Sequence, residues 1–512
     1  SPCQQLSLRQ CVANTNMSNY ENIERQVPDP LNTVEPQPPP VERDEVSYWM
    51  RCVTIPLVFF YAVGMMSRDN VIQNLILDKV CRYYSSLDEA MCDNQTMNVT
   101  VRNILQQDSV LLNMFSQLIQ LLPGAFMSLF LGPWIDQYGG RNLMILPIVG
   151  NFLGTIVYYL CIQFWPNSPP EMVLVASVPI GLTGAKVIFN MALYKYIANI
   201  STKPTKNISF VIADSVMMAS IPMASALTGL IFKKAQYAGL FSFSAGFQLL
   251  GLFFLFCMPN DYHVRTNSVS PTCNCSTLLS VDSIQQSFYA VFRQRPLNRT
   301  RRICLLIGIL SLFTLVFQGV DLNIQFFFLA NRFNWTMPQY MFFVSWSVGV
   351  MSVGSILIIA LFSHVFHIAD DWIVLIGIFV RVGTLIMFGL SSATWFIYTA
   401  GAISFMYGAL FSCIRSQLSK LAGSDEEGKL FAVMSSAEAC LPVIGIPLFS
   451  LIYQGSIGLD PGIIYYTAAA ITGLTLILIS LHIFYRRKEE SQILSTKNEL
   501  VNNDSQQFSS VL

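Results

Sequence analysis

Charged side chains lie inside long apolar stretches of this chain, where a charge without a partner is costly. Arg415, Asp214 and Glu438 each lie within, or at the border of, an apolar run long enough to cross a membrane. An uncompensated charge in a membrane helix costs roughly 2.5–3.5 kcal/mol even on a lenient insertion scale. Arg415 could reach the headgroups or brace a neighbouring helix. Alternatively, it could face a water-filled path and handle an anion or a proton partner.

The two carboxylates in this set have chemistry suited to proton exchange. Burial disfavours the charged form of a carboxylic acid, so a buried acid can take up and release a proton near neutral pH. Proton coupling requires such a group. Asp214 lies close to the start of its apolar run and could instead cap a helix end, whereas Glu438 lies deeper in its own run.

Two further apolar runs become polar at matching depth. Arg68 and Asp69 lie about 17 residues into the run at 52–77, and Asp321 lies about 18 residues into the run at 303–329. Helices that face lipid could not carry these groups, so we expect them to line a shared cavity, with pairing inside the bundle as the alternative. Neighbouring residues point apart around a helix, so Arg68 and Asp69 need not satisfy each other.

Other polar residues embedded in apolar runs have more limited roles. Lys186 in the fourth run could attract an anionic substrate, and Arg381 in the ninth run is expected to be a structural brace. Asn113, Gln117 and Gln120 recur at three- and four-residue spacing in the second run, which predicts one polar stripe on that helix.

Composition places the chain in the membrane class. It has 512 residues, of which 53% are hydrophobic and 12% are charged, against roughly 25% charged in soluble domains. A net charge of zero argues against a nucleic-acid partner. Four histidines without a compact His/Cys/Asp cluster argue against a metal enzyme, and no nucleophile–base pair indicates another kind of enzyme. We expect no cofactor.

Apolar runs of about 20 residues, the length that crosses a bilayer, predict an all-α membrane protein. There are twelve, at 52–77, 109–131, 143–163, 171–197, 209–232, 238–258, 303–329, 338–362, 372–391, 395–420, 429–453 and 462–485. The longest gap follows the sixth, which suggests two related six-helix halves, a common transporter plan. The expected parts are a disordered cytoplasmic tail (1–50), two halves (51–258 and 303–486), a central cytoplasmic loop (259–302) and a cytoplasmic tail (487–512).

Basic residues in the short loops indicate the orientation. They are enriched in the loops after the even-numbered runs, including Lys203, Lys206 and the sequence Arg486-Arg487-Lys488 after the last run. Both termini are therefore expected to be cytoplasmic.

The first outer loop then carries the candidates for covalent modification. Cys81 and Cys92 share this loop and could form a disulfide if it is extracellular. Asn94 and Asn98 lie in the same loop and Asn334 lies in a later outer loop, each in a sequon, so these three are the glycosylation candidates.

The turn between the second and third runs reads GPWIDQYGGR, from Gly132 to Arg141. It resembles the signature of the major facilitator superfamily, although Gly140 stands where that family usually has its first arginine. Gly132 permits close helix contact and Gly139 a tight turn. Asp136 can cap a helix and pair with a basic group, so the turn, with Arg141 as its remaining basic residue, is expected to latch one conformation.

The region around Arg415 carries a more specific resemblance. The sequence Arg415-Ser416-Gln417-Leu418-Ser419-Lys420-Leu421, followed by Glu427-Gly428-Lys429-Leu430-Phe431, resembles the proton-coupled folate transporter family, also called solute carrier family 46. The resemblance covers about residues 50–486. It implies a twelve-span major facilitator fold and an electrochemically driven carrier of folates or other anionic organic solutes, such as muropeptides and lysosomal breakdown products.

The resemblance also implies residue roles. Arg415 and Asp214 match positions that contribute to substrate or proton handling in the folate transporter. Asn199 replaces an aspartate of that transporter, and the seventh span has Asp321 where the family has a proton-linked histidine. These departures favour another organic anion over folate, with protons as the coupling ion.

Two other functions and two locations stay open. The chain could be a transporter-fold receptor or regulator without net flux. A membrane enzyme is the remaining hypothesis, which the sequence supports less than the other two. The location is the plasma membrane or an endolysosomal membrane. Tyr20-Glu21-Asn22-Ile23 and Glu489-Glu490-Ser491-Gln492-Ile493-Leu494 have the form of sorting signals, which would make sorting adaptors partners of the tails.

Overall fold

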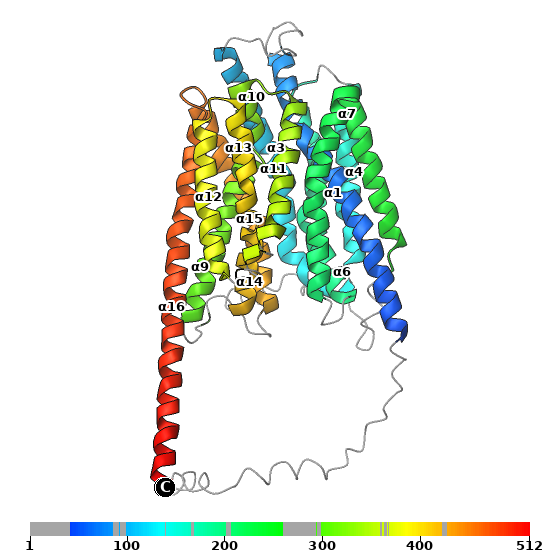
Figure 1. The fold of residues 1–512 in the computed structure, drawn as a ribbon. Helices are drawn as coiled ribbons and strands as arrows, with labels where there is room; N and C mark the ends of the chain where they lie inside the picture. The colour runs from blue at the N-terminus through cyan, green and yellow to red at the C-terminus, as the bar shows by residue number, and fades with distance from the viewer. Residues whose placement is uncertain are drawn as a thin grey trace, which may run out of the picture. The chain divides into compact units, whose positions relative to one another are not determined.

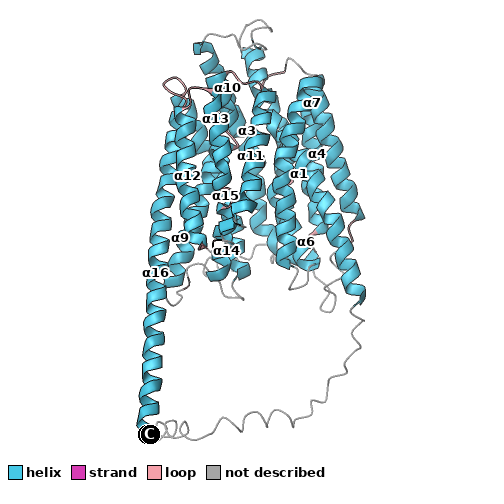
Figure 2. Ribbon diagram, viewed as in Figure 1, coloured by secondary structure: helices cyan, strands magenta, loops and turns pink. Residues whose placement is uncertain are grey.

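The computed structural model describes residues 41–84, 92, 99–138, 140–164, 168–200, 206–259, 293, 298–358, 361–362, 366, 368–421 and 427–511. Residues Ser1–Ser47 and Tyr48–Leu512 are separate compact units. The second unit contains a bundle of long helices (Figure 1). Figure 2 shows that the secondary structure of the described residues is helical throughout, without a strand.

The helices up to residue 257 are called the N-terminal half. They are α1 (Val41–Tyr84), α3 (Val99–Tyr138), α4 (Arg141–Gln163), α5 (Met172–Leu182), α6 (Ala185–Ile200) and α7 (Lys206–Cys257). The α7 helix contains the fifth and sixth predicted spans, joined at Gln236, whose φ of 52° and ψ of −152° break the helical path. This kink reverses the chain between two spans without an intervening loop.

The helices from residue 299 onward are called the C-terminal half. They are α9 (Arg299–Val316), the π turn η4 (Phe317–Asp321), α10 (Gln325–Phe333), α11 (Met337–Ile358), α12 (Asp370–Leu390), α13 (Thr394–Ile403), the 3₁₀ turn η6 (Ser404–Met406), α14 (Leu410–Leu421), α15 (Glu427–Ser456) and α16 (Ile463–Val511). The tenth predicted span is thus α13, η6 and α14 in succession.

All twelve predicted spans lie on these helices, although length and composition alone select nine candidate spans among the described residues. The α7 segment counts once in that selection but holds two predicted spans. The α1 helix is not among the nine candidates, and the apolar part of α15 is the stretch Cys440–Ser456, which is shorter than the candidate spans. Large apolar side chains such as Phe126, Phe253 and Phe379 are exposed on these helices, as expected of surfaces that face lipid.

Two helices extend beyond the expected boundaries. The α1 helix begins at Val41, inside the predicted tail at 1–50, and α16 continues to Val511 through the predicted tail at 487–512. Charged residues stop a membrane span but not a helix, because Arg, Lys, Glu and Gln are good helix formers. Arg486 and Glu490 illustrate this with an ion pair of 2.9 Å one turn apart on α16.

Three spans are interrupted midway. The fourth breaks between α5 and α6 at Gly184, where φ is +79° and a Cβ atom would lie 1.9 Å from the side chain of Ile188, so only glycine fits this turn. The seventh breaks at η4 and the tenth at η6. Interrupted helices at membrane depth leave backbone groups and side chains available for a polar site.

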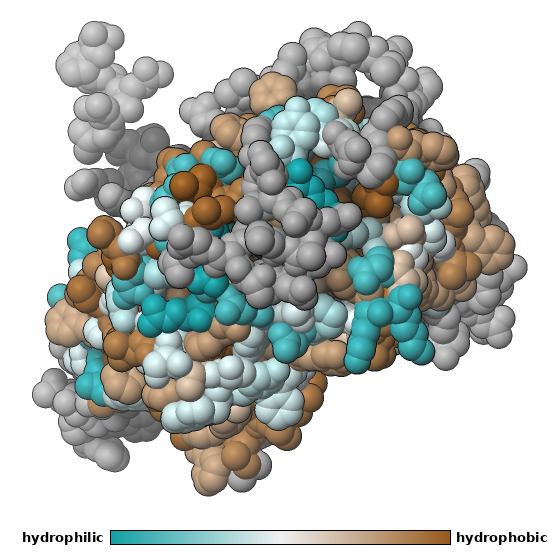
Figure 3. Space-filling view, turned by 90° about the horizontal axis from the view of Figure 1, so that it is seen from above, coloured by the Kyte–Doolittle hydropathy of each residue, from teal (hydrophilic) through white to brown (hydrophobic). Residues whose placement is uncertain are grey.

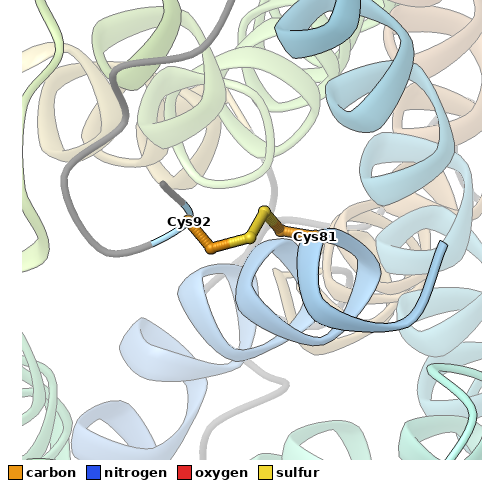
Figure 4. The surroundings of a disulfide bond; sticks show 2 residues. All are labelled: Cys81 and Cys92. Atoms are coloured by element: carbon orange, nitrogen blue, oxygen red, sulfur yellow. A yellow bond between two sulfur atoms is a disulfide. The ribbon is translucent and has the colours of Figure 1, made fainter. Parts of the chain in front are cut away.

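The bundle has two distinct ends. Cys81, at the end of α1, forms a disulfide with Cys92 (Figure 4), and α10 lies at the same end of the bundle, uppermost in Figure 1. We call this the disulfide end. Figure 3 views it from above, with hydrophobic residues prominent around the rim and hydrophilic residues across the face. The opposite end, where α6 and α14 finish, is called the Arg415 end.

The apolar core differs between the two ends. One buried cluster contains residues of both halves, including Val71 and Val110 of the N-terminal half and Phe326 to Ala330 of the C-terminal half. Two other clusters are each confined to one half, between Leu57 and Met258 in the first and between Ile303 and Ile479 in the second. A fourth, smaller cluster of Met114, Leu121 and Ile446 also joins the halves. The described residues therefore share apolar contacts between the halves toward the disulfide end and midway along α3 and α15, while the other two clusters stay within one half each.

Candidate functional site

Arg415 joins the two halves through a cluster of polar side chains. Its Nη2 donates to both carboxylate oxygens of Glu438, at 3.0 and 2.9 Å, and its Nη1 lies 3.7 Å from Oδ2 of Asp214. The hydroxyl of Tyr194 donates to Oδ1 of Asp214 at 2.5 Å. These four residues come from α14, α15, α7 and α6, and we call them the bridge cluster.

The bridge cluster is built unequally across the two halves. Arg415 and Glu438 belong to the same half, so their close contact can persist when the halves move. The longer Arg415–Asp214 contact spans the halves and must break if they separate at this end. Both members of that contact are partly exposed, at 36% and 39% of their side-chain surface, so water or a solute can reach them.

The chemistry of the cluster suits both an anion and a proton. A guanidinium presents several donors and pairs well with carboxylate or phosphate groups, and the Nε of Arg415 has no hydrogen-bond partner among the described residues. Two acids share this one cation. Protonation of either acid would weaken its hold on Arg415 and leave donors free for an anionic solute.

Arg68 and Asp69 pair with each other, so the expectation that they would point apart is wrong. The Nε and Nη2 of Arg68 donate to Oδ1 of Asp69 at 2.9 and 2.6 Å, and Nη1 donates to Oδ1 of Asn151 on α4 at 2.6 Å. The long arginine side chain can fold back toward its neighbour even though the two Cα–Cβ bonds diverge. Arg68 is fully buried, whereas about a third of the Asp69 side chain is exposed.

Lys186 lies in the first turn of α6, directly after the break at Gly184. It is half-buried, and the described residues include no hydrogen-bond or ion-pair partner for its ammonium group. Asp69 is an acid close enough for its charge to act on Lys186. The start of α6 adds the partial positive charge of a helix N-terminus, so this part of the N-terminal half is electropositive.

Asp321 is paired inside the C-terminal half. Its carboxylate forms an ion pair with Nη2 of Arg381 on α12, and Nη1 of Arg381 donates to the hydroxyl of Tyr407 at 3.0 Å. Only 3% of the Arg381 side chain and 12% of the Asp321 side chain are exposed. Arg381, which was expected to be a structural brace, therefore neutralises Asp321, which was expected to line a cavity.

The described part of the predicted latch is Arg141. Its Nε and Nη2 donate to the backbone carbonyls of Leu255 and Phe256, at 3.2 and 3.1 Å, near the C-terminus of α7. A cation there interacts favourably with the helix dipole. Gly132 and Asp136 lie on α3, but the side chain of Asp136 and the whole of Gly139 lie outside the described residues, so the latch stays a prediction.

The candidate modification sites lie at the disulfide end. The Cα atoms of Cys81 and Cys92 are 6.0 Å apart across their disulfide. Asn334 is exposed at the C-cap of α10, and its side-chain oxygen accepts a hydrogen bond from Arg102 of α3 at 2.5 Å. Asn94 and Asn98 lie outside the described residues.

The sorting signal expected in the C-terminal tail, from Glu489 to Leu494, lies on α16, and its first residue contacts the bundle. Glu489 pairs with Arg302 at 2.6 Å and with Arg299 at 3.0 Å, which ties α16 to the start of α9. The other expected signal, from Tyr20 to Ile23, lies outside the described residues.

Sequence reasoning missed the contacts between the halves at the disulfide end. Asn113 donates to Asn323 at 2.6 Å, and Gln73 donates to the backbone carbonyl of Leu322 at 2.8 Å. The polar stripe predicted on the second span was the available signal, because amides on an apolar helix need partners. Tyr194 was also missed, although it lies two helical turns after Lys186 on the same helix.

Comparisons with known proteins agree with the helical arrangement. The sequence profile of the Major Facilitator Superfamily matches residues 96–437. The "Probable peptidoglycan muropeptide transporter SLC46" of Drosophila melanogaster is 22% identical over 438 residues, covering 83% of each chain. The mouse "Lysosomal proton-coupled steroid conjugate and bile acid symporter SLC46A3" is 26% identical over 398 residues, covering 76% of this chain and 84% of the relative.

A solved structure shares the fold. The human organic anion transporter MFSD10 superposes with a TM-score of 0.58 at 16% identity, covering 86% of this chain and all of that one. Distant relatives from solute carrier family 46 thus cover most of the chain, in accord with the resemblance around Arg415. The chain is a multi-pass membrane protein that belongs to the Major Facilitator Superfamily, a family of transporters rather than enzymes.

Proposed function

We propose that this protein is a proton-coupled secondary active transporter that carries an organic anion across a membrane by alternating access. The observation that carries the proposal is Arg415, which two acids share and which bridges the halves where their apolar cores are separate. The proposed moving units are the two six-helix halves, residues 51–258 and 303–486.

The names of the relatives support the substrate class. The mouse relative is named as a proton-coupled symporter of steroid conjugates and bile acids, the fly relative as a muropeptide transporter, and the solved structure as an organic anion transporter. Arg415 in one half and Lys186 in the other supply cations for such a solute. Arg68 holds Asp69 in place near Lys186, which leaves Asp69 to respond to the solute or to a proton.

The proposed cycle begins from the conformation described here, closed at the disulfide end. Protonation of Asp214 or Glu438 loosens its hold on Arg415, and the anion then engages the freed guanidinium. When the anion leaves, the acids lose their protons and Arg415 restores the link between the halves. Arg415 thus exchanges a carboxylate partner for the anionic group of the solute, which limits the cost of an unpaired charge at any step.

The proposed orientation places the Arg415 end and both termini in the cytosol. The basic residues after the even-numbered spans support it. The disulfide end then faces the exterior or an organelle lumen, where disulfides persist, and Asn94, Asn98 and Asn334 become accessible to glycosylation. The proposed location is the plasma membrane or an endolysosomal membrane.

The test is uptake of labelled organic anions at acidic and neutral outside pH. A panel containing a bile acid, a steroid sulfate and a muropeptide would be applied to the wild-type protein and to Arg415→Ala, Glu438→Gln and Asp214→Asn. We expect acid-stimulated uptake of at least one anion, its loss in Arg415→Ala, and a weakened pH response in the two acid variants.

Lys420→Gln is the matched control, because Lys420 is also a cation of α14 but 67% of its side chain is exposed and its partner Asp370 belongs to the same half. It should transport like the wild type. Uptake that ignores both pH and these substitutions would overturn the proton-coupled assignment. Solute binding without uptake, at wild-type surface levels, would point to a receptor instead.

A further inference from the structure

The seventh span is interrupted at a place where it could bend. The π turn η4 separates α9 from α10, and residues 322–324 after it are not in regular helix. Single π turns within α-helices occur frequently at functional sites. The segment beyond the turn, α10, is a helix of nine residues, short enough to move as a unit about residues 317–324.

The α10 segment is held to the N-terminal half by the shared apolar core, which includes Phe326 to Ala330, and by a few polar contacts. Asn331 donates to Asn103 of α3 at 3.0 Å, and Arg102 donates to Asn334 at 2.5 Å. Asn323 accepts from Asn113 before α10 begins. These contacts involve no carboxylate, so they can break singly without leaving a buried anion unpaired.

The π turn itself is fixed on two sides. Gly319 packs on α15, where a Cβ atom at residue 319 would lie 2.8 Å from the carbonyl oxygen of Gly445. On another side, the buried Arg381 of α12 pairs with Asp321, the last residue of η4, and is itself bonded to Tyr407. The carboxylate that ends the turn is therefore tied to a helix that does not belong to the seventh span.

We propose that Asp321, Arg381 and Tyr407 form a buried lock that fixes the π turn and thereby holds α10 against the N-terminal half. In this arrangement α10 is the moving gate of the disulfide end, and η4 is its hinge. Arg381 is a positioning residue that acts through Asp321. The role of such a gate in transport rests on the proposed function, but the closure of α10 can be measured without transport.

The step from lock to gate follows from the order of residues along the chain. The residue after Asp321 is Leu322, whose carbonyl oxygen accepts from Gln73, and the next is Asn323, which bonds both Asn113 and Ser450. A shift of Asp321 away from Arg381 would carry these acceptors with it. The contacts of Asn331 and Asn334 farther along α10 would then separate from α3.

Intramolecular cross-linking can test this inference. Asn103→Cys with Asn331→Cys forms a gate pair across the moving contact, and Gln107→Cys with Gln454→Cys forms a frame pair between α3 and α15 at the same end. A protease site placed in residues 260–292 separates the halves on a denaturing gel unless a bifunctional thiol reagent has joined them. The full-length protein without an added pair gives the background from native cysteines.

The lock variants are Asp321→Asn, Arg381→Gln and the milder Tyr407→Phe, which removes only a hydroxyl acceptor. We expect Asp321→Asn and Arg381→Gln to lower cross-linking of the gate pair by at least about threefold, with the frame pair nearly unchanged. Tyr407→Phe should lower it less, and Arg381→Lys, which keeps the cation, should retain more of it than Arg381→Gln.

Three results would overturn the inference: an unchanged gate pair, an equal loss in both pairs, or the same loss in Arg381→Lys as in Arg381→Gln. If Asp321→Asn or Arg381→Gln does not elute as a monodisperse protein, the comparison of Tyr407→Phe with the wild type decides the matter. Because no solute is present, a protein that fails every uptake assay can still show the lock, and an active transporter can lack it.

Discussion

Substitutions at Asp214 and Glu438 should have opposite effects on the Arg415 end, although both remove one acid from the same arginine. Asp214→Asn removes the charge that Arg415 meets across the halves, at 3.7 Å. Glu438→Gln removes the charge that it meets within its own half, at 2.9 Å. We expect the first substitution to open this end and the second to leave it closed or to close it further.

The magnitude follows from exposure. Arg415 and Asp214 have 36% and 39% of their side chains exposed, so solvent screening limits their pair to about 1 kcal/mol or less. Loss of such a pair shifts a two-state equilibrium by up to about fivefold. In Glu438→Gln, Arg415 no longer divides its charge between two acids, so its attraction to Asp214 should be undiminished or stronger.

The assay is the distance between spin labels on opposite halves near this end. Cys440 is exposed on α15 and Ile212 is exposed on α7, so labels at Cys440 and at Ile212→Cys would report separation. Other thiols outside the disulfide would be replaced by serine. We expect a larger fraction of molecules with a long distance between the labels in Asp214→Asn than in the wild type. This fraction should not increase in Glu438→Gln or in the control Lys420→Gln.

The reasoning would be refuted if Glu438→Gln opened the end as much as Asp214→Asn did. That result would mean that Arg415 closes the end through its position on Glu438 rather than through its charge contact with Asp214. An unchanged distance in both variants would show that other contacts hold the halves together there.

Three further predictions concern stability, measured as the temperature at which half of the detergent-solubilised protein remains monodisperse. Gly319→Ala should lower it, because the new methyl group would meet the carbonyl of Gly445 and overpacking costs about 1–3 kcal/mol, whereas Gly473→Ala, with open space around it, should not. Cys92→Ser should lower it by removing a disulfide between residues 11 apart. Such a cross-link typically stabilises the folded state by about 2–4 kcal/mol, because it restricts the unfolded chain. Lys420→Gln should change it little, because 67% of the Lys420 side chain is exposed and solvent screening limits the ion pair of an exposed lysine to about 1 kcal/mol.

The helices were predictable from the sequence because twelve apolar runs of bilayer length leave few alternatives. Their ends were not. Val41 and Val511 lie in polar sequence that can form helix as readily as coil once a membrane helix has started it. The break at Gly184 was also hidden, because one glycine in an apolar run is compatible with a continuous helix.

The charged residues of the site could be found from the sequence, but their partners could not. Arg415, Glu438 and Asp214 stood out because charges are rare in such runs, and the structure brings them together. The pairing of Asp321 with Arg381 depends on how the seventh and ninth spans pack, which no local pattern encodes. Arg68 and Asp69 were misjudged because the geometry of the Cβ atoms does not limit a side chain as long as arginine.

The apolar cores at the two ends differ in extent, which implies that opening the disulfide end and opening the Arg415 end change the heat capacity by different amounts. Opening the disulfide end would expose part of a core shared by both halves, and wetting apolar surface raises the heat capacity. Opening the Arg415 end would mainly expose a polar bridge between cores that are already separate. The equilibrium between the two conformations should therefore curve with temperature, and the closure of the disulfide end should weaken on cooling.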